Sequence, residues 1–342
     1  MKKYILSLLM CAIILGIFVF NKYNTSQQSQ MLPARRTDFV LNTICTVTLY
    51  DGENLEDPMG IIGEGFQLCR EYENIFSTTI EGSEIYNINN SKGETIQVSD
   101  DVKNILETSL KYSKITNGAF DVAIYPVSKL WQFGVENPVP PADEDIQENL
   151  RYVGYDMIEI DGNNVTLKNE NAGIDLGAIA KGYIADKMKE FFVEKGVTNA
   201  TINLGGNIIT IGGVSEEEDF TIGVQKPFGE TNEVLGVLKI NGRAVTTSGI
   251  YERCFEYNGQ FYHHILDPNT GYPVENDLAA VTIISDKSID GDALSTSCFL
   301  LGEEKALELI NSIENTDAIF VKKDGELIYS DGIGSDVIFE VN

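Results

Sequence analysis

Short apolar runs separated by glycine-containing turns are the feature that most restricts the fold of this 342-residue chain. Residues 157–160 and 164–168 predict a hairpin around Asp161-Gly162. Residues 200–203 and 208–211 predict a second hairpin whose turn contains two glycines. Strands joined by a tight turn run in opposite directions, so these hairpins predict antiparallel sheet.

Helical and strand patterns alternate irregularly along the rest of the chain, and no internal repeat is visible. We expect helices at 60–73, 99–116, 175–195, 290–301 and 303–312, and further strands at 39–50, 220–224, 234–240, 255–257, 279–284, 318–322 and 327–329. Irregular alternation with frequent hairpins predicts an α+β fold, a single large domain with mostly antiparallel sheets flanked by helices.

The N-terminus has the pattern of a targeting segment. Lys2 and Lys3 precede an unbroken apolar stretch at 4–20, which is typical of a signal peptide or an uncleaved membrane anchor. No small-x-small cleavage site follows, so the anchor is favoured for residues 1–20. Residues 21–36 are polar and predict a linker, and residues 37–342 predict a folded catalytic domain outside the cytoplasm.

Charge and cysteine content exclude several classes of function. The net charge of -27 repels a polyanion, which excludes nucleic-acid binding. A phosphate-bearing substrate would therefore need local compensation by a metal, a lysine or a helix N-terminus. The five cysteines are scattered without a Cys-x-x-Cys pair, so neither a zinc site nor a dithiol redox motif is indicated.

The segment Asp292-Ala-Leu-Ser-Thr296 places a carboxylate and a hydroxyl four residues apart. On a helix this spacing brings both oxygens to one face, where with Ser295 they suit a hard cation such as Mg²⁺. Helix capping by Asp292, with both hydroxyls on a polar surface, is an equally good interpretation of the spacing alone.

The segment Asp175-Leu-Gly-Ala-Ile-Ala-Lys-Gly-Tyr183 predicts a helix start. Helix N-termini bind phosphates, and Lys181 lies close enough to this start to reach a bound anion. Asp175 as a simple N-cap, with glycine as a close-packing residue, is the alternative.

The only two histidines, His263 and His264, are adjacent. In an extended segment, neighbouring side chains point to opposite faces, so at most one of them faces a given site. That histidine is a candidate general base, and Asp267 is a candidate for orienting it. A purely structural role for both is the alternative.

Two further segments are, by themselves, weak indications of a ligand-binding site. Ser248-Gly-Ile-Tyr-Glu-Arg253 supplies a hydroxyl and a guanidinium just before the histidines. Asn117-Gly-Ala-Phe-Asp121 is typical of a loop that packs an aromatic ring against a planar ligand.

Taken together and in this order, these segments resemble the FAD:protein FMN transferases, also called ApbE-type flavin transferases. The matching pieces extend over roughly 37–329 and are Asn117-Gly-Ala-Phe-Asp-Val-Ala, Asp175-Leu-Gly-Ala-Ile-Ala-Lys-Gly-Tyr, Asn203-Leu-Gly-Gly-Asn, Thr247-Ser-Gly-Ile-Tyr-Glu-Arg, His264-Ile-Leu-Asp-Pro-Asn-Thr-Gly-Tyr-Pro and Asp292-Ala-Leu-Ser-Thr.

The resemblance implies a site for FAD and Mg²⁺. Metal ligands would be the Asp292 carboxylate, the Thr296 hydroxyl and the Ala178 carbonyl, with Ser295 beside them. Catalytic residues would be His264 and Asp292. FAD-binding residues would be Leu41, Gly118, Ala119, Phe120, Asp121, Asp175, Lys181, Ser248, Arg253 and Ile265. The segment containing Leu41 departs from the family's usual Met-Gly-Thr or Met-Asp-Thr.

The resemblance also implies a reaction and a partner. FMN would be transferred from FAD to a threonine or serine hydroxyl of an acceptor protein, a membrane redox subunit, with release of AMP. With the anchor, this places the protein at the bacterial cell membrane. Two other functions remain open: an Mg²⁺-dependent FAD pyrophosphatase that gives FMN and AMP, and a non-catalytic extracytoplasmic flavin-binding protein.

Overall fold

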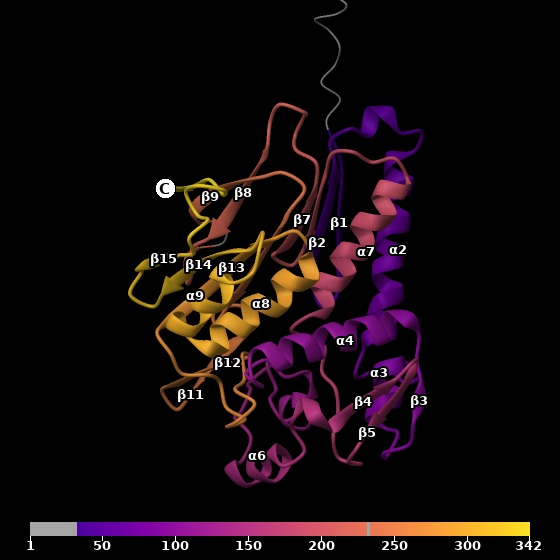
Figure 1. Ribbon diagram of the computed structural model, residues 1–342, viewed down its shortest axis with the longest axis vertical. Helices are drawn as coiled ribbons and strands as arrows, with labels where there is room; N and C mark the ends of the chain where they lie inside the picture. The colour runs from indigo at the N-terminus through magenta and orange to yellow at the C-terminus, as the bar shows by residue number, and fades with distance from the viewer. Residues whose placement is uncertain (1–32, 231–232) are drawn as a thin grey trace, which may run out of the picture.

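An antiparallel eight-stranded sheet runs through the centre of the computed structural model, which describes residues 33–230 and 233–342 (Figure 1). Its strand order is β1-β2-β6-β7-β10-β13-β14-β15. The strands are β1 (Ala34–Val40), β2 (Thr43–Leu49), β6 (Ala200–Leu204), β7 (Asn207–Ile211), β10 (Ala244–Gly249), β13 (Leu278–Ser285), β14 (Asp317–Lys322) and β15 (Leu327–Tyr329).

Helices cover one face of this sheet. α2 (Pro58–Phe76) packs on β1, α7 (Ala180–Glu194) on β6 and β7, and α8 (Ser288–Leu301) on β10 and β13. α9 (Glu303–Asn311) follows α8 and packs on β14. The main hydrophobic core contains side chains of these helices and of the sheet. Figure 1 shows the helices lying against the sheet.

A small sheet covers part of the other face. It contains β8 (Phe220–Gln225), β9 (Val234–Ile240) and β16 (Phe339–Val341) in the order β16-β9-β8. Its apolar side chains form a second core with Val245, Ile284 and Ile319 of the large sheet. Because both faces are covered, all eight residues of β13 are buried, and its sequence is a continuous run rather than an alternating one.

Apart from η1, which lies near the start of α2 at the top of the picture, the remaining elements form a region below the large sheet in Figure 1. A three-stranded sheet of order β3-β5-β4 packs there with helices. A two-stranded hairpin, β11–β12, lies nearby. The bounds are η1 (Gly52–Asn54), α3 (Glu84–Asn89), β3 (Ile96–Gln97), α4 (Asp100–Ile115), η2 (Val122–Ile124), α5 (Tyr125–Ser128), α6 (Asp143–Leu150), η3 (Tyr155–Met157), β4 (Ile158–Asp161), β5 (Asn164–Leu167), β11 (Cys254–Tyr257) and β12 (Gln260–His263).

The predicted α+β class with mostly antiparallel sheet is confirmed, and both predicted hairpins form as β4–β5 and β6–β7. Gly205 and Gly206 have φ of 64° and 91°, a conformation that glycine adopts without steric cost. Ser99 caps α4 by accepting a hydrogen bond from the N–H of Val102.

The single strand predicted over 39–50 is wrong. The chain turns at Leu41 and Asn42, both with φ of 56°, and forms the hairpin β1–β2. Two successive residues with positive φ make the tight turn that suits a twisted hairpin, but leucine rarely adopts it, so the sequence pattern does not reveal the turn. β1 also begins at Ala34, inside the segment predicted as a linker up to residue 36.

The predicted anchor at residues 1–20 lies outside the described residues. Among the helices at 33–230 and 233–342, none combines the length and hydropathy needed to cross a bilayer.

Candidate functional site

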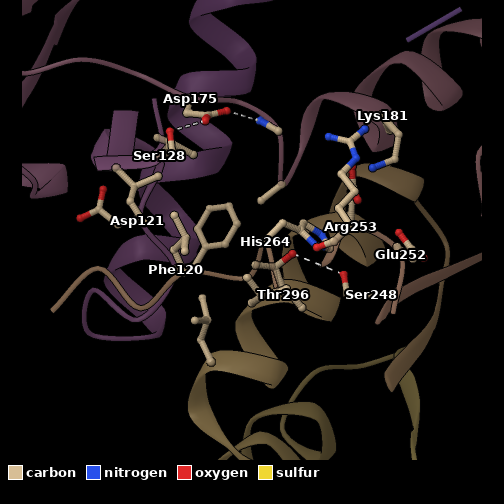
Figure 2. A pocket seen from close by; sticks show the side chains of 18 of the residues that line it. Phe120, Asp121, Ser128, Asp175, Lys181, Ser248, Glu252, Arg253, His264 and Thr296 are labelled. Carbon is tan, nitrogen blue, oxygen red and sulfur yellow. Dashed lines mark hydrogen bonds between the residues drawn. The ribbon is translucent and has the colours of Figure 1, made fainter. Parts of the chain in front are cut away.

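A cavity of about 300 Å³ lies where α7, α8, β10 and the loops around residues 120 and 264 meet (Figure 2). It collects side chains from every segment that the sequence analysis singled out. Predicted site residues that line it are Phe120, Asp121, Asp175, Ala178, Lys181, Ser248, Arg253, His264, Ile265, Asp292 and Thr296.

α7 packs closely against α8. This packing brings the segment that contains Lys181 next to the segment that contains Asp292 and Thr296. Gly182 faces α8 so closely that an added Cβ would lie 2.4 Å from the backbone oxygen of Ser288. The N–H of Gly182 donates to Oδ2 of Asp292 at 2.8 Å. Asp292 therefore supplies an acceptor to the first turn of α7, where backbone N–H groups lack partners within the helix.

The helix start predicted at Asp175 is wrong. α7 begins at Ala180, and the residues before it form a loop. Asp175 shapes this loop by accepting hydrogen bonds from the N–H of Gly177 at 2.9 Å and from Ser128 Oγ at 2.6 Å. Lys181 thus occupies the second position of the helix, still beside an N-terminus that faces the cavity.

The predicted cation donors lie at the cavity. Asp292, Thr296 and Ala178 all line it. Asp292 Oδ2 is engaged by Gly182, and no hydrogen bond within the described chain engages Oδ1. A carboxylate oxygen, a hydroxyl and a carbonyl are ligands that suit Mg²⁺, which keeps water or substrate phosphate in its other positions. These donors fit the predicted metal.

Ser295 does not line the cavity. It is fully buried, donates to the carbonyl of Asp292 at 2.9 Å and pairs with Ser248 Oγ at 2.8 Å. Ser248 also lies 3.4 Å from Thr296 Oγ1. Ser295 is therefore placed to hold Ser248 beside the donor set, with its own oxygen already engaged.

No cluster of three or more histidine, cysteine, aspartate or glutamate side chains capable of holding a metal occurs within 33–230 and 233–342. A transition-metal centre of that kind needs several such ligands. The donor set around Asp292 has one carboxylate, so it suits a hard cation shared with a phosphate-bearing ligand.

The two histidines face opposite ways, as the extended segment predicts. His263 is buried, and its Nε2 hydrogen-bonds to the carbonyl of Val274 at 3.1 Å. His264 lines the cavity, and its Nδ1 lies 3.3 Å from the carbonyl of Arg253. A carbonyl only accepts, so Nδ1 carries the proton and Nε2 of His264 is left with its lone pair.

The surroundings of His264 keep it neutral. Burial lowers its pKa to about 3, and the positive charges of Arg253 and Lys181 act in the same direction. Asp267 does not orient the ring, contrary to expectation, because its Oδ1 accepts from the backbone and side-chain N–H groups of Asn269. The carbonyl of Arg253 does so instead.

Two cations, Lys181 and Arg253, line the cavity together with four carboxylate residues, Asp121, Asp175, Glu252 and Asp292. Neither Lys181 nor Arg253 forms an ion pair within 4.0 Å with another described residue. Glu252, which the sequence analysis did not single out, lines the cavity and keeps an exposed surface, although protein surrounds it on most sides. This burial raises the pKa of Glu252 to about 7.

The loop after α4 places an aromatic ring in the cavity wall. Asn117 and Gly118 have φ of 51° and 83°, which turns the chain back after the helix. The N–H of Phe120 donates to Thr116 Oγ1 at 3.0 Å, and the Phe120 ring lies at the cavity. Gly118 and Ala119 are not among the lining residues; they shape the turn.

Asp121 lines the cavity, but its carboxylate accepts hydrogen bonds from backbone N–H groups. It accepts from the N–H groups of Ala123 and Tyr155, both at 2.7 Å, and Figure 2 shows it directed away from Lys181 and Arg253. Burial raises the pKa of Asp121 to about 6. Its geometry is that of a residue that positions Phe120.

Leu41, predicted as an FAD-binding residue, is also absent from the cavity wall. It lies in the β1–β2 turn, where its N–H donates to Glu73 Oε1 at 2.9 Å. That turn packs beside the β6–β7 turn, because Thr43 touches the position of a Cβ on Gly205. Leu41 therefore lies beside the strand pair that carries the lining residue Asn207.

Among the lining residues that sequence reasoning missed are Asn207, Trp131 and Phe133. Asn207 is buried and accepts from Thr246 Oγ1 and Ser288 Oγ. Trp131 and Phe133 are stacked, with ring centroids 5.5 Å apart and planes 9° apart. Trp131, the only tryptophan, was a signal that could have been followed.

Comparison with known proteins agrees with this geometry. The chain matches the ApbE family over residues 41–320. A protein of Klebsiella pneumoniae named FAD:protein FMN transferase is 40% identical over 268 residues, covering 78% of this chain and 83% of that protein. A Treponema pallidum protein of the same name is 31% identical over 314 residues, 87% of each chain.

Among solved structures, the crystal structure of the ApbE protein of Thermotoga maritima superposes with a TM-score of 0.79 and 29% identity. The match covers 87% of this chain and 97% of that one. A family match over most of the chain, with relatives this similar along most of their length, decides the classification: this chain belongs to the ApbE family.

Proposed function

We propose that this protein is an Mg²⁺-dependent FAD:protein FMN transferase, which attaches FMN to a threonine or serine hydroxyl of an acceptor protein and releases AMP. One observation carries the proposal. A single cavity brings together an uncharged histidine, two cations without an ion pair among the described residues, and a donor set for a hard cation, all from separate segments. The relatives named FAD:protein FMN transferase support it.

Local positive charge allows an acidic protein to bind an anionic substrate. The chain carries a net charge of -27, yet Lys181 and Arg253 face the cavity beside the N-terminus of α7. These groups compensate the charges of the FAD pyrophosphate at short range. The Phe120 ring offers an apolar surface for a flavin or adenine ring.

His264 is placed to activate the acceptor hydroxyl. Its Nε2 accepts the hydroxyl proton while the oxygen attacks the phosphorus of the FMN half of FAD. The bond from that phosphorus to the bridging oxygen breaks, and the bridging oxygen leaves on AMP. His264, whose low pKa favours the neutral ring, then passes the proton to the phosphate of the leaving AMP, while its Nδ1–H remains bonded to the Arg253 carbonyl.

Lys181 and Arg253 stabilise the negative charge that develops on the phosphoryl oxygens during this step. Asp292, Thr296 and the Ala178 carbonyl would hold Mg²⁺, which when bound adds positive charge at the same oxygens. The hydrogen bond between Ser248 and Ser295 holds the Ser248 hydroxyl beside Thr296.

The acceptor and the cellular location complete the proposal. A membrane redox subunit is the acceptor, and residues 1–20 anchor the enzyme at the bacterial cell membrane with its catalytic domain outside the cytoplasm. The two lysines followed by an apolar stretch support this location. Fractionation of cells and sequencing of the mature N-terminus test it, and a soluble protein that begins after residue 20 contradicts it.

The central experiment incubates purified protein with FAD, Mg²⁺ and candidate membrane subunits, followed by mass spectrometry of each subunit. We expect one subunit to gain the mass of FMN less one water, with AMP released in equal amount. FAD consumption with no protein modified, at the same rate with and without acceptor, would show a pyrophosphatase. FAD binding without turnover would show a non-catalytic flavin-binding protein.

A further inference from the structure

Asn207 brings a buried side-chain amide to the cavity wall with one end of the amide unpaired. It is the first residue of β7, is 1% exposed and lines the cavity. Its Oδ1 accepts hydrogen bonds from Thr246 Oγ1 at 3.2 Å and from Ser288 Oγ. Its Nδ2 is also buried, and no residue at 33–230 or 233–342 accepts a hydrogen bond from it. The amide therefore holds N–H donors without a partner in the described chain.

The two hydroxyls decide which end of the amide stays unpaired. Both are buried, and among the described residues Asn207 is the only group to which the Thr246 and Ser288 hydroxyls hydrogen-bond. If the amide were turned over, both hydroxyl hydrogens would face an N–H2 group and lose their acceptor. The orientation with Oδ1 toward the hydroxyls satisfies them, so Nδ2 is the end left for a ligand.

An unpaired donor at this depth is unusual. Burial removes the water that would otherwise accept from it, so native proteins leave few such groups without a partner. Of the buried side-chain atoms that lack a partner in the described part of the chain, only Nδ2 of Asn207 belongs to a residue that lines this cavity. Its position indicates an acceptor on a bound ligand.

The partners of Asn207 place its amide beside the cationic end of the cavity. Ser288 lies against Gly182, the residue that follows the cavity lysine. Thr246 Oγ1 would lie 2.9 Å from a Cβ added to Gly291, which immediately precedes the carboxylate of the donor set. The amide is therefore next to the groups that are proposed to hold phosphate and cation.

We propose that the Asn207 amide donates a hydrogen bond to an oxygen of the FAD pyrophosphate and so holds it beside Lys181. The proposal rests on the proposed function for the identity of the ligand. A phosphate oxygen is charged, which makes it the strongest acceptor on such a substrate. Lys181 and Arg253 are donors only, and water bound to a cation directs its hydrogens outward. The substrate is therefore the source of the acceptor.

Three other partners of the amide predict different behaviour. An ordered water would satisfy Nδ2 without contributing to FAD affinity. A carbonyl of the flavin ring would make the contact independent of the phosphates. The cation would be the partner only if the amide were turned over, with its oxygen as a ligand.

Asn207→Asp is the sharpest variant, because its carboxylate keeps an acceptor for both hydroxyls and replaces only the N–H2 group by an oxygen. Asn203→Asp is the control. It adds the same charge to the same hairpin, keeps the acceptor for the Gly206 N–H, and lies outside the cavity lining. FAD is titrated by flavin fluorescence in EDTA at pH 8. We expect Asn207→Asp to weaken FAD binding at least tenfold, and Asn203→Asp to match wild type.

Ligands that contain part of FAD locate the contact. ADP keeps both phosphates, so Asn207→Asp should weaken ADP binding, measured by displacement of FAD, as much as FAD binding. Riboflavin has no phosphate and should bind wild type and variant alike. Unchanged ADP affinity overturns the proposal. An equal loss of riboflavin affinity would assign the amide to the flavin ring, and it overturns the proposal as well.

Asn207→Ala tests the orientation of the amide, and it also serves if the Asp variant does not fold. In calorimetry with Mg²⁺ and no FAD, Asn207→Ala should bind the cation as wild type does, while its FAD binding falls at least tenfold. A loss of Mg²⁺ affinity would show that the amide oxygen faces the cation, which overturns the proposal. Unchanged FAD affinity in the variants would show that the amide bonds only to water.

The outcome for the proposed function is read separately from wild type. If wild type transfers FMN and the Asn207 variants bind FAD as tightly as wild type, only the Asn207 contact fails. If wild type binds FAD and modifies no protein, the transferase function fails, while the binding measurements still decide the role of Asn207. If wild type does not bind FAD, both fail.

Discussion

The two sides of the cavity are built differently. On the helix side, Asp292 and Ser295 are buried. Asp292 of α8 accepts from the Gly182 N–H of α7, Ser295 of α8 pairs with Ser248 of β10, and Gly182 has no room for an added atom. On the loop side, Glu252 and Arg253 are exposed and lie in the loop between β10 and β11. The helix side fixes the groups that hold a cation and phosphate, while the loop side leaves room for a second substrate.

This contrast predicts on which side of the cavity a substitution alters stability and activity together. Substitution on the helix side changes packing, metal binding and activity together, because the same atoms serve all three. Substitution on the loop side changes chemistry or recognition while the fold persists, since few buried contacts are lost. Four variants, ordered by expected effect, examine this contrast.

Asp292→Ala should have the largest effect. It removes the single carboxylate of the donor set and the acceptor for the Gly182 N–H. We expect transfer to be abolished and Mg²⁺ affinity, measured by calorimetry, to be lost. The missing helix-start acceptor should cost about 1 kcal/mol of unfolding free energy. Wild type that remains fully active in EDTA contradicts the metal assignment.

His264→Ala should reduce transfer by about 10²–10⁴-fold, the usual contribution of a general base. FAD affinity should stay near wild type, because the base acts on the hydroxyl. Single-turnover assays with the acceptor and fluorescence titration of FAD separate the two quantities.

His263→Ala is the matched control for this prediction. It leaves the cavity intact but removes a buried ring that bonds to Val274, so it should lower the melting temperature more than the rate. A larger loss of transfer in His263→Ala than in His264→Ala would mean that His263 is the general base and His264 the structural residue.

Gly182→Ala tests whether activity depends on the close contact between α7 and α8. The added methyl would lie 2.4 Å from the Ser288 carbonyl and 2.7 Å from Asp292 Cβ, so α7 and α8 must separate. Overpacking of this kind costs about 1–3 kcal/mol. Displacement of Lys181 and Asp292 by about an ångström should lower transfer about 10²-fold.

Gly196→Ala provides a comparison for this variant, because Gly196 follows the C-terminus of α7 at φ of 87° with open space around it. It should lose stability through backbone strain alone and keep its activity. Chemical denaturation and transfer assays report the two effects. Equal activity loss in both variants would mean that the α7–α8 contact has no special role.

Glu252→Gln should have the smallest effect, visible as a pH dependence. Burial raises the pKa of Glu252 to about 7, so it is neutral below that pH and anionic above it. The FAD pyrophosphate is anionic across this range, whereas His264, with a pKa of about 3, stays neutral. Metal-free wild type should therefore bind FAD a few-fold more weakly at pH 8 than at pH 6.

The Gln variant should bind FAD with the same affinity at both pH values, close to that of wild type at pH 6. Titrations at several ionic strengths give the check. A wild-type affinity that does not change between pH 6 and pH 8 would show that Glu252 does not approach the phosphates.

Local sequence predicted several elements because each depends on residues next to it. Gly205-Gly206 accept positive φ, which makes the β6–β7 hairpin, and Ser99 caps α4. By contrast, β10 went unpredicted: Ala244–Gly249 contains two threonines and a serine, and lies at the centre of the sheet only because β7 and β13 pair with it. Pairing with distant strands overrides weak local preference.

The candidate site likewise contains residues whose positions follow from local spacing and residues whose positions depend on contacts between distant segments. The spacing of Asp292, Ser295 and Thr296 places all three oxygens near one helix face, but Ser248 decides which hydroxyl is engaged and which faces the cavity. Glu252 had no pattern of its own, because the direction of a loop side chain depends on what packs around it.

The sequence by itself determined the α+β class, the antiparallel hairpins, the opposite faces of His263 and His264, and membership of the family, since these depend on local residue chemistry and on the order of motifs. The start of α7 at Ala180, the hydrogen bond between His264 and the Arg253 carbonyl, and the position of Glu252 at the cavity came from the tertiary structure alone. These facts depend on contacts between segments far apart in the chain, whose geometry no local pattern encodes.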